Sequence, residues 1–270
     1  MNSSIHPTDR VSASPLTFDR GGLPLVLFLL STSLLATLVP LFVYPNLGPA
    51  ASLAVMAAAF AGIAGAAWLA LRAEGVRGAD VGLSRDDVLP GVLPVLAVYL
   101  LVNAVAAVAV FLASGTVRFA VPGGISPSAW LAMAVVQVTF VGITEEFAFR
   151  GYVQNKLVAA FGGGTDRVRK ATAILLGVLL FALWHVPQRV FGQGLTAPGE
   201  VLGTLVVVVI LGTLLGVLYE YTRNVVRWGV LHGTVNWSFV FVVLVWYYRR
   251  WARATDPSSF RPQVQARVAR

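Results

Sequence analysis

The sequence predicts an all-α membrane protein, a polytopic bundle of about seven transmembrane helices with an eighth as the alternative. Hydrophobic residues make up 57% of the 270 residues, and the mean hydropathy is +0.77. Charged residues make up 12%, about half the fraction found in a typical soluble domain. Several apolar runs reach the roughly 20 residues that a helix needs to cross the hydrocarbon core. A soluble domain of this length could not cover so much apolar surface.

Seven runs have the length and composition of membrane spans. They cover residues 23–44, 51–71, 89–114, 128–149, 171–188, 201–220 and 229–248. The chain therefore divides into a polar N-terminal tail over 1–22, a membrane domain over 23–248 with its polar motifs in 128–248, and a basic C-terminal tail over 249–270. Gly212 and Gly216 form a small-xxx-small pair in the sixth run, which favours a close helix contact within the chain.

The basic residues predict an orientation in the membrane. If the N-terminus is cytoplasmic, the loops on that side collect most of the Lys and Arg residues, and the opposite loops hold only Arg118 and Arg189. The six Arg residues of the C-terminal tail then lie on the wrong side. An eighth span would correct this, but 229–248 is too short to cross twice. Arg supplies 18 of the 20 basic residues, which is typical of a GC-rich prokaryotic genome. The expected location is the cell membrane, or the endoplasmic reticulum membrane for a eukaryotic source.

The net charge of +8 predicts contact with lipid rather than with nucleic acid. Basic loops of membrane proteins face anionic headgroups. The sequence has no stripe of interleaved aromatic and basic residues of the kind that binds nucleic acid. It also has no cysteine, which excludes disulfides and thiolate metal ligands. Nothing in the pattern indicates an oligomeric state.

Few ionisable residues lie inside the predicted spans, where such groups usually mark function. Ten of the 12 acidic residues lie in loops, in tails or at span ends, whereas Glu145 and Glu146 lie inside an apolar run. Two of the three histidines, His185 and His232, lie in or beside spans, and Asn236 follows the second. These residues are the candidates for a polar site held within the bilayer.

Helical spacing separates the two carboxylates. Glu146 and Arg150 are four residues apart, so they share a helix face and can pair. Glu145 lies about 100° around the helix from Glu146 and about 500° from Arg150, which places it off that face. We therefore predict a structural ion pair between Glu146 and Arg150, and a role in chemistry for Glu145.

The same spacing occurs twice more. His232 and Asn236 are four residues apart and can present two hydrogen-bond donors together. Phe181 and His185 are also four apart, so the aromatic ring can hold the imidazole in place. Each pair alone has a structural interpretation, as a buried ion pair or as polar contacts between helices. Three such pairs among so few polar residues favour one functional site.

These residue types suit hydrolysis of an amide bond. A serine or cysteine nucleophile is not indicated, because there is no cysteine and no Gly-x-Ser-x-Gly motif. A glutamate and a histidine can together activate water. A second histidine and an asparagine can donate to the oxyanion of a tetrahedral intermediate. Alternatively, Glu145, His185 and His232 could ligate a zinc ion with one open position. The absence of a His-Glu-x-x-His motif removes the commonest zinc signature.

Two functions other than hydrolysis also remain open. The same cavity could belong to a non-catalytic peptide-binding or immunity-type membrane protein. A proton-coupled transporter could use Glu145 as its carrier, although the sequence shows no inverted repeat or pair of broken helices.

Three motifs together resemble a known family. Glu145-Glu146-Phe-Ala-Phe-Arg150 is similar to the Glu-Glu-x-x-x-Arg motif of the CAAX protease and bacteriocin-processing (CPBP/Abi) intramembrane proteases. Phe181-Ala-Leu-Trp-His185 is similar to their Phe-x-x-x-His motif, and His232-Gly-Thr-Val-Asn236 to their His-x-x-x-Asn/Asp motif. The three occur in order across 145–236, whereas residues 1–127 carry no motif.

The resemblance implies a helical endopeptidase with a cavity open towards the cytoplasm and a peptide or membrane-protein substrate. It implies that Glu145 and His185 activate water, that His232 and Asn236 bind the oxyanion, and that Glu146 and Arg150 support them. A glutamate mechanism requires no cofactor, while many members are labelled metalloproteases, which keeps the zinc alternative open. Eukaryotic members trim prenylated proteins, a substrate that prokaryotes generally lack.

Overall fold

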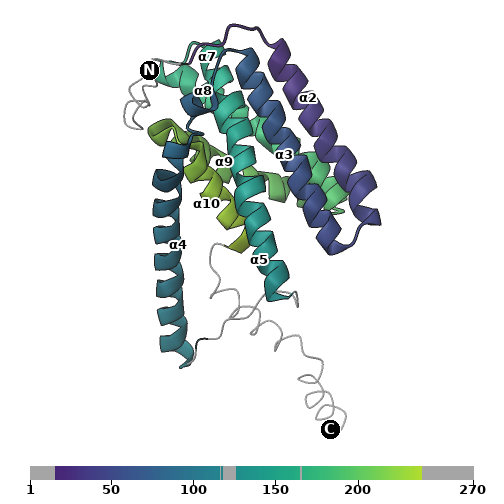
Figure 1. Ribbon diagram of the computed structural model, residues 1–270, viewed down its shortest axis with the longest axis vertical. Helices are drawn as coiled ribbons and strands as arrows, with labels where there is room; N and C mark the ends of the chain where they lie inside the picture. The colour runs from purple at the N-terminus through teal and green to yellow at the C-terminus, as the bar shows by residue number, and fades with distance from the viewer. Residues whose placement is uncertain (1–15, 116, 118–125, 165, 239–270) are drawn as a thin grey trace, which may run out of the picture. The chain divides into compact units, whose positions relative to one another are not determined.

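The computed structural model describes residues 16–115, 117, 126–164 and 166–238, and all the regular secondary structure in these residues is helical (Figure 1). Six described segments are long and apolar enough to cross a membrane. They are Leu23–Val43, Pro49–Ala73, Gly78–Ala113, Pro127–Ala160, Arg167–Gly192 and Pro198–Thr222. The predicted helical class is confirmed, and these segments correspond to the first six predicted spans.

The seventh predicted span, 229–248, is described only in its first half. That half belongs to α10 (Val225–Ser238), a helix of 14 described residues. The second half of the span, the alternative of an eighth span and the predicted tail over 249–270 lie outside the described residues.

The chain divides into two compact units. The first comprises residues 1–95 and 132–237, and the second comprises 96–131 and 238–270. The helix α4 (Arg85–Ser114) contributes to both units, as does the helix that begins with α5 (Pro127–Val135). All of the predicted site residues belong to the first unit.

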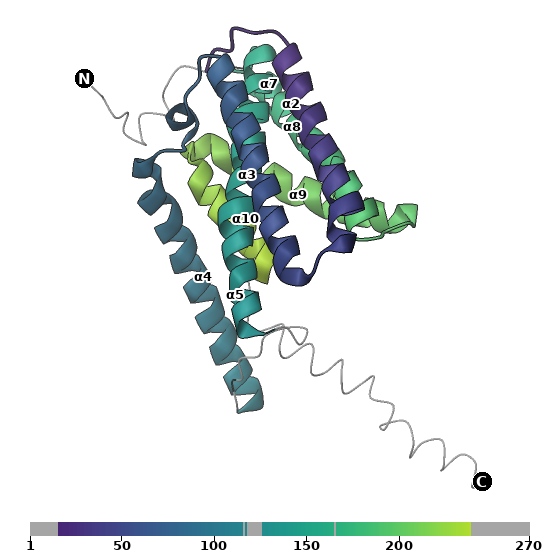
Figure 2. The ribbon, with the colours of Figure 1, turned by 45° about the vertical axis from the view of Figure 1, so that its right-hand side comes forward.

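The first unit is built from long helices that include short π-helical or 3₁₀ turns. Its α-helical segments are α2 (Leu23–Leu38), α3 (Pro49–Ala73), α6 (Ile143–Glu146), α7 (Asn155–Ala160), α8 (Arg167–Pro187), α9 (Pro198–Thr222) and α10. The turns are η1 (Val39–Val43), η2 (Tyr44–Asn46), η3 (Gly78–Val81), η5 (Val136–Gly142), η6 (Phe147–Gln154) and η7 (Gln188–Gly192). The neighbouring helices α2 and α3 run side by side, and α2 also contacts α8 (Figures 1 and 2).

The outer faces of these helices carry large apolar side chains. Leu30 is 64% exposed, Leu69 is 60% exposed and Ile210 is 62% exposed. Apolar faces of this extent are stable in contact with lipid, because the backbone polar groups of a helix are already paired. The protein is therefore a multi-pass membrane protein.

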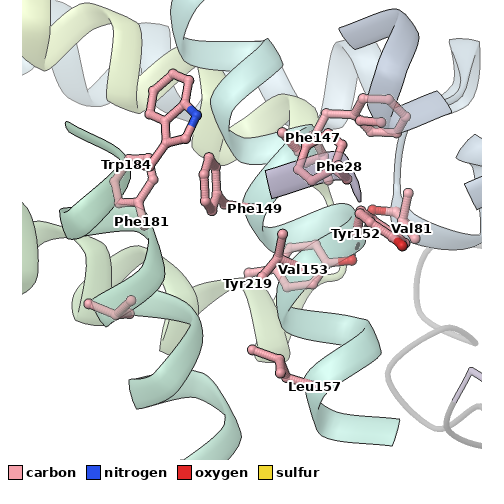
Figure 3. Close-up of a cluster of buried hydrophobic side chains, with 14 of the residues drawn as sticks. Phe28, Val81, Phe147, Phe149, Tyr152, Val153, Leu157, Phe181, Trp184 and Tyr219 are labelled. Carbon is pink, nitrogen blue, oxygen red and sulfur yellow. Dashed lines mark hydrogen bonds between the residues drawn. The ribbon is translucent and has the colours of Figure 1, made fainter. Parts of the chain in front are cut away.

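The helix formed by η5, α6, η6 and α7 is the core of the first unit. Every residue from 144 to 158 is buried, so this stretch is covered on all sides by other elements. Its aromatic side chains pack edge-on against rings of neighbouring helices (Figure 3). Tyr152 meets Phe28 of α2 with ring centroids 5.3 Å apart, and Phe149 meets Phe181 of α8 at 4.7 Å. Glu145 and Glu146 thus lie in the most enclosed part of the unit.

A buried ion pair anchors one end of this central helix. Lys156 of α7 pairs with Glu74, the residue that follows α3. The backbone N–H of Arg20 donates to Glu74 Oε2 at 2.9 Å, and Leu16 and Phe18 pack against the core. The described end of the segment predicted as a polar tail therefore rests on the bundle and covers this ion pair.

We expect Thr17 and Gln193 to lie on opposite sides of the membrane, because five candidate spans separate them. The natural sequence has no cysteine, and both side chains are exposed. Single Thr17→Cys and Gln193→Cys variants should therefore react with a membrane-impermeant maleimide from opposite faces of oriented vesicles. Labelling of both from the same face would contradict the arrangement of spans.

Candidate active site

The two central carboxylates lie on a single α-helical turn between two π-helical segments. Glu145 and Glu146 end α6, with η5 before it and η6 after it. A π-helical turn shifts the faces on which later side chains lie, and such turns are frequent at functional sites. Both carboxylates are buried, with Glu145 at 3% and Glu146 at 0% exposure.

Three glycines let α10 approach this helix until the backbones touch. A Cβ on Gly233 would lie 2.2 Å from the carbonyl oxygen of Gln137, and one on Gly229 would lie 2.5 Å from the Cα of Ile143. On the facing helix, a Cβ on Gly142 would lie 2.2 Å from the carbonyl oxygen of Gly229. No side chain fits at these contacts. The close approach places His232 directly beside the two carboxylates.

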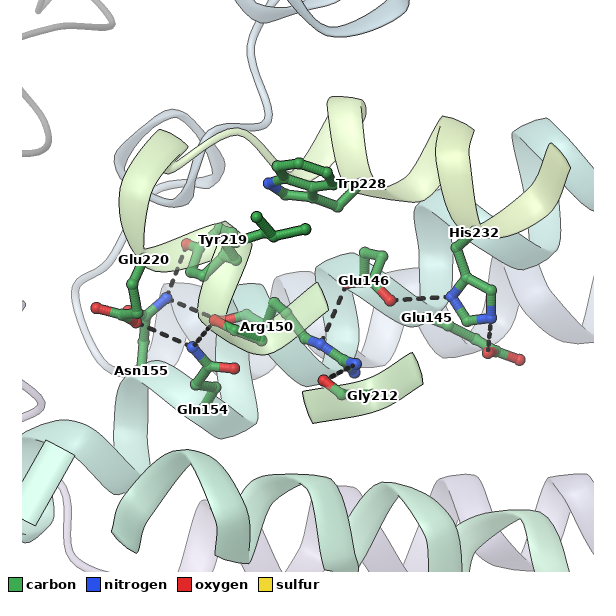
Figure 4. A network of polar contacts seen from close by, with 12 residues as sticks. Glu145, Glu146, Arg150, Gln154, Asn155, Gly212, Tyr219, Glu220, Trp228 and His232 are labelled. Carbon is green, nitrogen blue, oxygen red and sulfur yellow. Dashed lines mark hydrogen bonds and ion pairs between the residues drawn. The ribbon is translucent and has the colours of Figure 1, made fainter. Parts of the chain in front are cut away.

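Glu146 has charged and hydrogen-bonding partners on both sides (Figure 4). Its Oε2 lies 3.2 Å from Arg150 Nε, as the four-residue spacing predicts. Its Oε1 accepts a hydrogen bond from His232 Nδ1 at 2.9 Å. Arg150 also donates from Nη2 to the carbonyl oxygen of Gly212 at 3.0 Å and lies over the Phe181 ring. The guanidinium therefore links the central helix to α8 and α9.

Glu145 lies between two imidazoles without a close hydrogen bond from either. Its Oε2 is 3.5 Å from His232 Nε2 and 3.8 Å from His185 Nε2. This oxygen is buried and has no hydrogen-bond partner among the described residues. A buried carboxylate oxygen without a donor is unfavourable in a folded protein. Glu146 Oε2 also has no hydrogen bond, but it pairs with the guanidinium of Arg150, whereas Glu145 Oε2 faces only the two imidazoles.

Contacts on its own helix orient the ring of His185. Nδ1 lies 2.8 Å from the carbonyl oxygen of Phe181, and because a carbonyl can only accept, Nδ1 carries the proton. The Phe181 ring meets the imidazole edge-on at 4.5 Å, and the Trp184 ring meets it at 5.3 Å. In the neutral ring Nε2, which faces Glu145, is the proton acceptor.

The four residues predicted to carry the chemistry line one cavity of about 260 Å³. Glu145 enters it from the central helix, His185 from α8, and His232 and Asn236 from α10. Phe181 also lines the cavity, whereas Glu146 and Arg150 do not. Apolar side chains of α3 and α9 complete the walls, among them Met56, Phe60, Val208 and Leu211. The three sequence motifs thus meet at one place.

Four polar lining residues were not among the sequence-predicted site residues. They are Gln137, Gln188, Arg189 and Gln193. Two of them had a detectable signal in the sequence, because Arg189 follows His185 by one helical turn and Gln137 precedes Glu145 by about two. Gln188 and Gln193 follow the apolar part of their span and resemble ordinary loop residues in the sequence.

Polar side chains of the central helix also attach it to α9. Gln154 Nε2 donates to the carbonyl oxygen of Gly216 at 3.0 Å and to Glu220 Oε1 at 2.9 Å. A Cβ on Gly216 would lie 2.9 Å from Gln154 Oε1. The predicted contact of Gly212 and Gly216 within the chain is therefore confirmed, and its partners are the side chains of Arg150 and Gln154.

The predicted zinc ligands do not form a metal site in this arrangement. Among the described residues, no group of three or more His, Asp or Glu side chains is placed to hold a metal ion. Glu145, His185 and His232 are therefore not placed to hold a metal ion together, although Glu145 Oε2 faces both imidazoles.

Residues 127–238 match the family described as Type II CAAX prenyl endopeptidase Rce1-like. The matched region contains all three motifs and every residue predicted for the site. Comparisons with curated proteins and with solved structures found no match.

Replacing Gly233 by alanine should separate α10 from the central helix, because the added Cβ meets backbone atoms. We expect a loss of about 1–3 kcal/mol of stability, the usual cost of overpacking, seen as a lower unfolding temperature in detergent micelles. The matched control is Gly203→Ala in α9, where nothing lies within 4 Å of the added Cβ. Equal unfolding temperatures for the two variants would contradict the backbone contact.

Proposed function

We propose that this protein is an intramembrane endopeptidase. Its residues 127–238 match the Rce1-like type II CAAX prenyl endopeptidase family. In the proposed reaction, Glu145 and His185 activate the water that hydrolyses the peptide bond. The substrate is a peptide or a membrane-associated protein. The observation that carries the proposal is the unpartnered carboxylate oxygen of Glu145, which faces two imidazoles in a cavity of the membrane domain.

Water activation follows from the placement of Glu145 and His185. Glu145 Oε2 and His185 Nε2 are 3.8 Å apart, so one water molecule can donate to both. Glu145 takes a proton from this water as the oxygen attacks the carbonyl carbon of the substrate. The carbonyl π electrons move to its oxygen and form the oxyanion. Glu145 then returns the proton to the amide nitrogen, the C–N bond breaks, and the oxyanion re-forms the carbonyl. The products are an amine and a carboxylic acid, which passes its hydroxyl proton to the amine and leaves as a carboxylate.

The oxyanion needs hydrogen-bond donors close to the carbonyl oxygen of the substrate. We assign this role to His232 Nε2 and to the side-chain amide of Asn236, which line the same cavity from α10. His232 Nδ1 is held by Glu146 Oε1, so the ring orientation is set before substrate arrives. In this role the His232 ring carries a proton on each nitrogen.

Glu146 and Arg150 then act through His232 rather than on the substrate. Neither lines the cavity, and each is at most 2% exposed. Glu146 orients His232, and Arg150 balances the charge of Glu146 while it ties the central helix to α9. They are positioning residues.

Replacing Glu145 by glutamine should lower cleavage by about 10²–10⁴-fold, because the amide cannot accept the proton from water. The assay uses proteoliposomes with quenched fluorescent peptides, both prenylated and unprenylated. The control is Glu200→Gln, which changes an exposed carboxylate in the first turn of α9. A Glu145→Gln protein that is folded and still cleaves would refute the role of Glu145. Saturable peptide binding by the wild type without cleavage would instead indicate a non-catalytic peptide-binding protein.

Chelation should leave the cleavage rate unchanged, because every proposed step uses side chains and water. The measurement compares the rate before and after dialysis against a strong zinc chelator. A loss of activity that added zinc restores would favour the alternative in which Glu145, His185 and His232 ligate a metal.

A further inference from the structure

The cavity contains one permanent positive charge that the proposed mechanism does not use. Apart from the two imidazoles, its charged lining residues are Glu145 and Arg189. Glu145 serves as the base in the proposed reaction, whereas Arg189 has no assigned role. Arg189 lies in η7, one turn beyond His185 on the same helix.

The guanidinium of Arg189 lacks the carboxylate partners that Arg150 and Arg223 have. Its Nε is buried without a hydrogen bond, and no carboxylate of the described residues lies within 4 Å of it in an ion pair. The Nε of Arg150 also has no hydrogen bond, but its guanidinium pairs with Glu146, donates to the Gly212 carbonyl and lies over the Phe181 ring. Arg223 pairs with Glu220. Arg189 is therefore a cation in the cavity wall whose donors remain available.

A half-buried guanidinium in a cavity wall at the end of a span is well placed to bind an anion. The span Arg167–Gly192 contains Arg189, and the guanidinium stays protonated at any physiological pH. Its planar fork of N–H donors matches a carboxylate, with two parallel hydrogen bonds. The neighbouring Gln188 and Gln193 are neutral. Among the described residues, Glu145, the other charged residue of the wall, lies within ion-pair distance only of the two imidazoles.

We infer that Arg189 binds a carboxylate of the substrate, and so selects peptides with a free carboxylate near the cleaved bond. The inference rests on the proposed endopeptidase function, because it places the peptide in this cavity. His185 and Arg189 are four residues apart, which is about 6 Å along a helix. A carboxylate on Arg189 therefore lies close to the bond that the water between Glu145 and His185 attacks. The carboxylate is either the C-terminus of the peptide or an Asp or Glu side chain.

The test measures peptide binding separately from cleavage. The full chain with Glu145→Gln is placed in phosphatidylcholine nanodiscs, and fluorescein-labelled hexapeptides of Ala, Val and Leu are titrated by anisotropy. One peptide ends in a free carboxylate, one ends in an amide, and one ends in an amide but carries an internal Glu. We expect at least one carboxylate peptide to bind roughly tenfold or more tightly than the plain amide. The peptide that gains affinity identifies the source of the carboxylate.

The Arg189→Gln substitution in the same background should abolish this preference and leave the affinity for the plain amide unchanged. Arg189→Lys should retain part of the preference for carboxylate peptides, because lysine keeps the positive charge but lacks the two parallel N–H donors of the guanidinium. The control is Arg167→Gln, at the exposed first residue of α8. In the active enzyme, Arg189→Gln should raise KM for the preferred peptide more than it lowers kcat.

Three results would overturn the inference. The first is equal affinity for all three peptides, or binding of none of them. The second is an equal loss of affinity for every peptide with Arg189→Gln, and the third is a change in affinity with Arg189→Gln that appears only after anionic lipid is added. The last would identify Arg189 as a lipid contact. Wild-type protein that shows the carboxylate preference but cleaves nothing would refute only the proposed function. Wild-type protein that cleaves acid and amide peptides equally well would refute only the role of Arg189.

Discussion

The carboxylate of Glu146 joins the elements from which the site is built. It pairs with Arg150 one turn along its own helix and accepts a hydrogen bond from His232 of α10. Through Arg150 it is connected to the Gly212 carbonyl of α9 and to the Phe181 ring of α8. A buried charge is tolerated only when such partners surround it, so a change in any of these helices leaves a charge or a donor unsatisfied. The positions of the two imidazoles beside Glu145 depend on this arrangement.

The neighbouring residues Glu145 and Glu146 have different environments for a geometric reason. Successive residues of a helix point about 100° apart, so two adjacent carboxylates cannot meet the same partners. Glu146 pairs with the guanidinium of Arg150, whereas Glu145 faces the cavity and its nearest charged partners are two imidazoles. The protein thereby stabilises one buried carboxylate and keeps the adjacent one available. Unpaired polar groups of this kind inside a membrane domain mark function rather than stability.

The cavity lies towards one end of the first unit. Its lining includes Gln188 and Arg189 at the end of the fifth span, and the exposed Gln193 just beyond it. In the orientation that the basic residues favour, this end faces away from the cytoplasm. The family resemblance implies a cavity open towards the cytoplasm. The two expectations disagree about the side of the membrane that the cavity faces, and labelling of Gln193→Cys from one known face decides between them.

Local sequence determined the spans, the pairing of Glu146 with Arg150 and the identity of the polar motifs. These features depend on hydropathy over about 20 residues and on the four-residue period of a helix, both readable from a single segment. Only the tertiary structure showed that His232 contacts Glu146, a residue 86 positions away, as well as facing Glu145. It also placed Arg189 and Gln137 in the cavity wall. Such contacts depend on how closely the helices approach, and here their backbones touch at Gly142, Gly229 and Gly233. The periodicity of a single segment does not encode the distance between two helices.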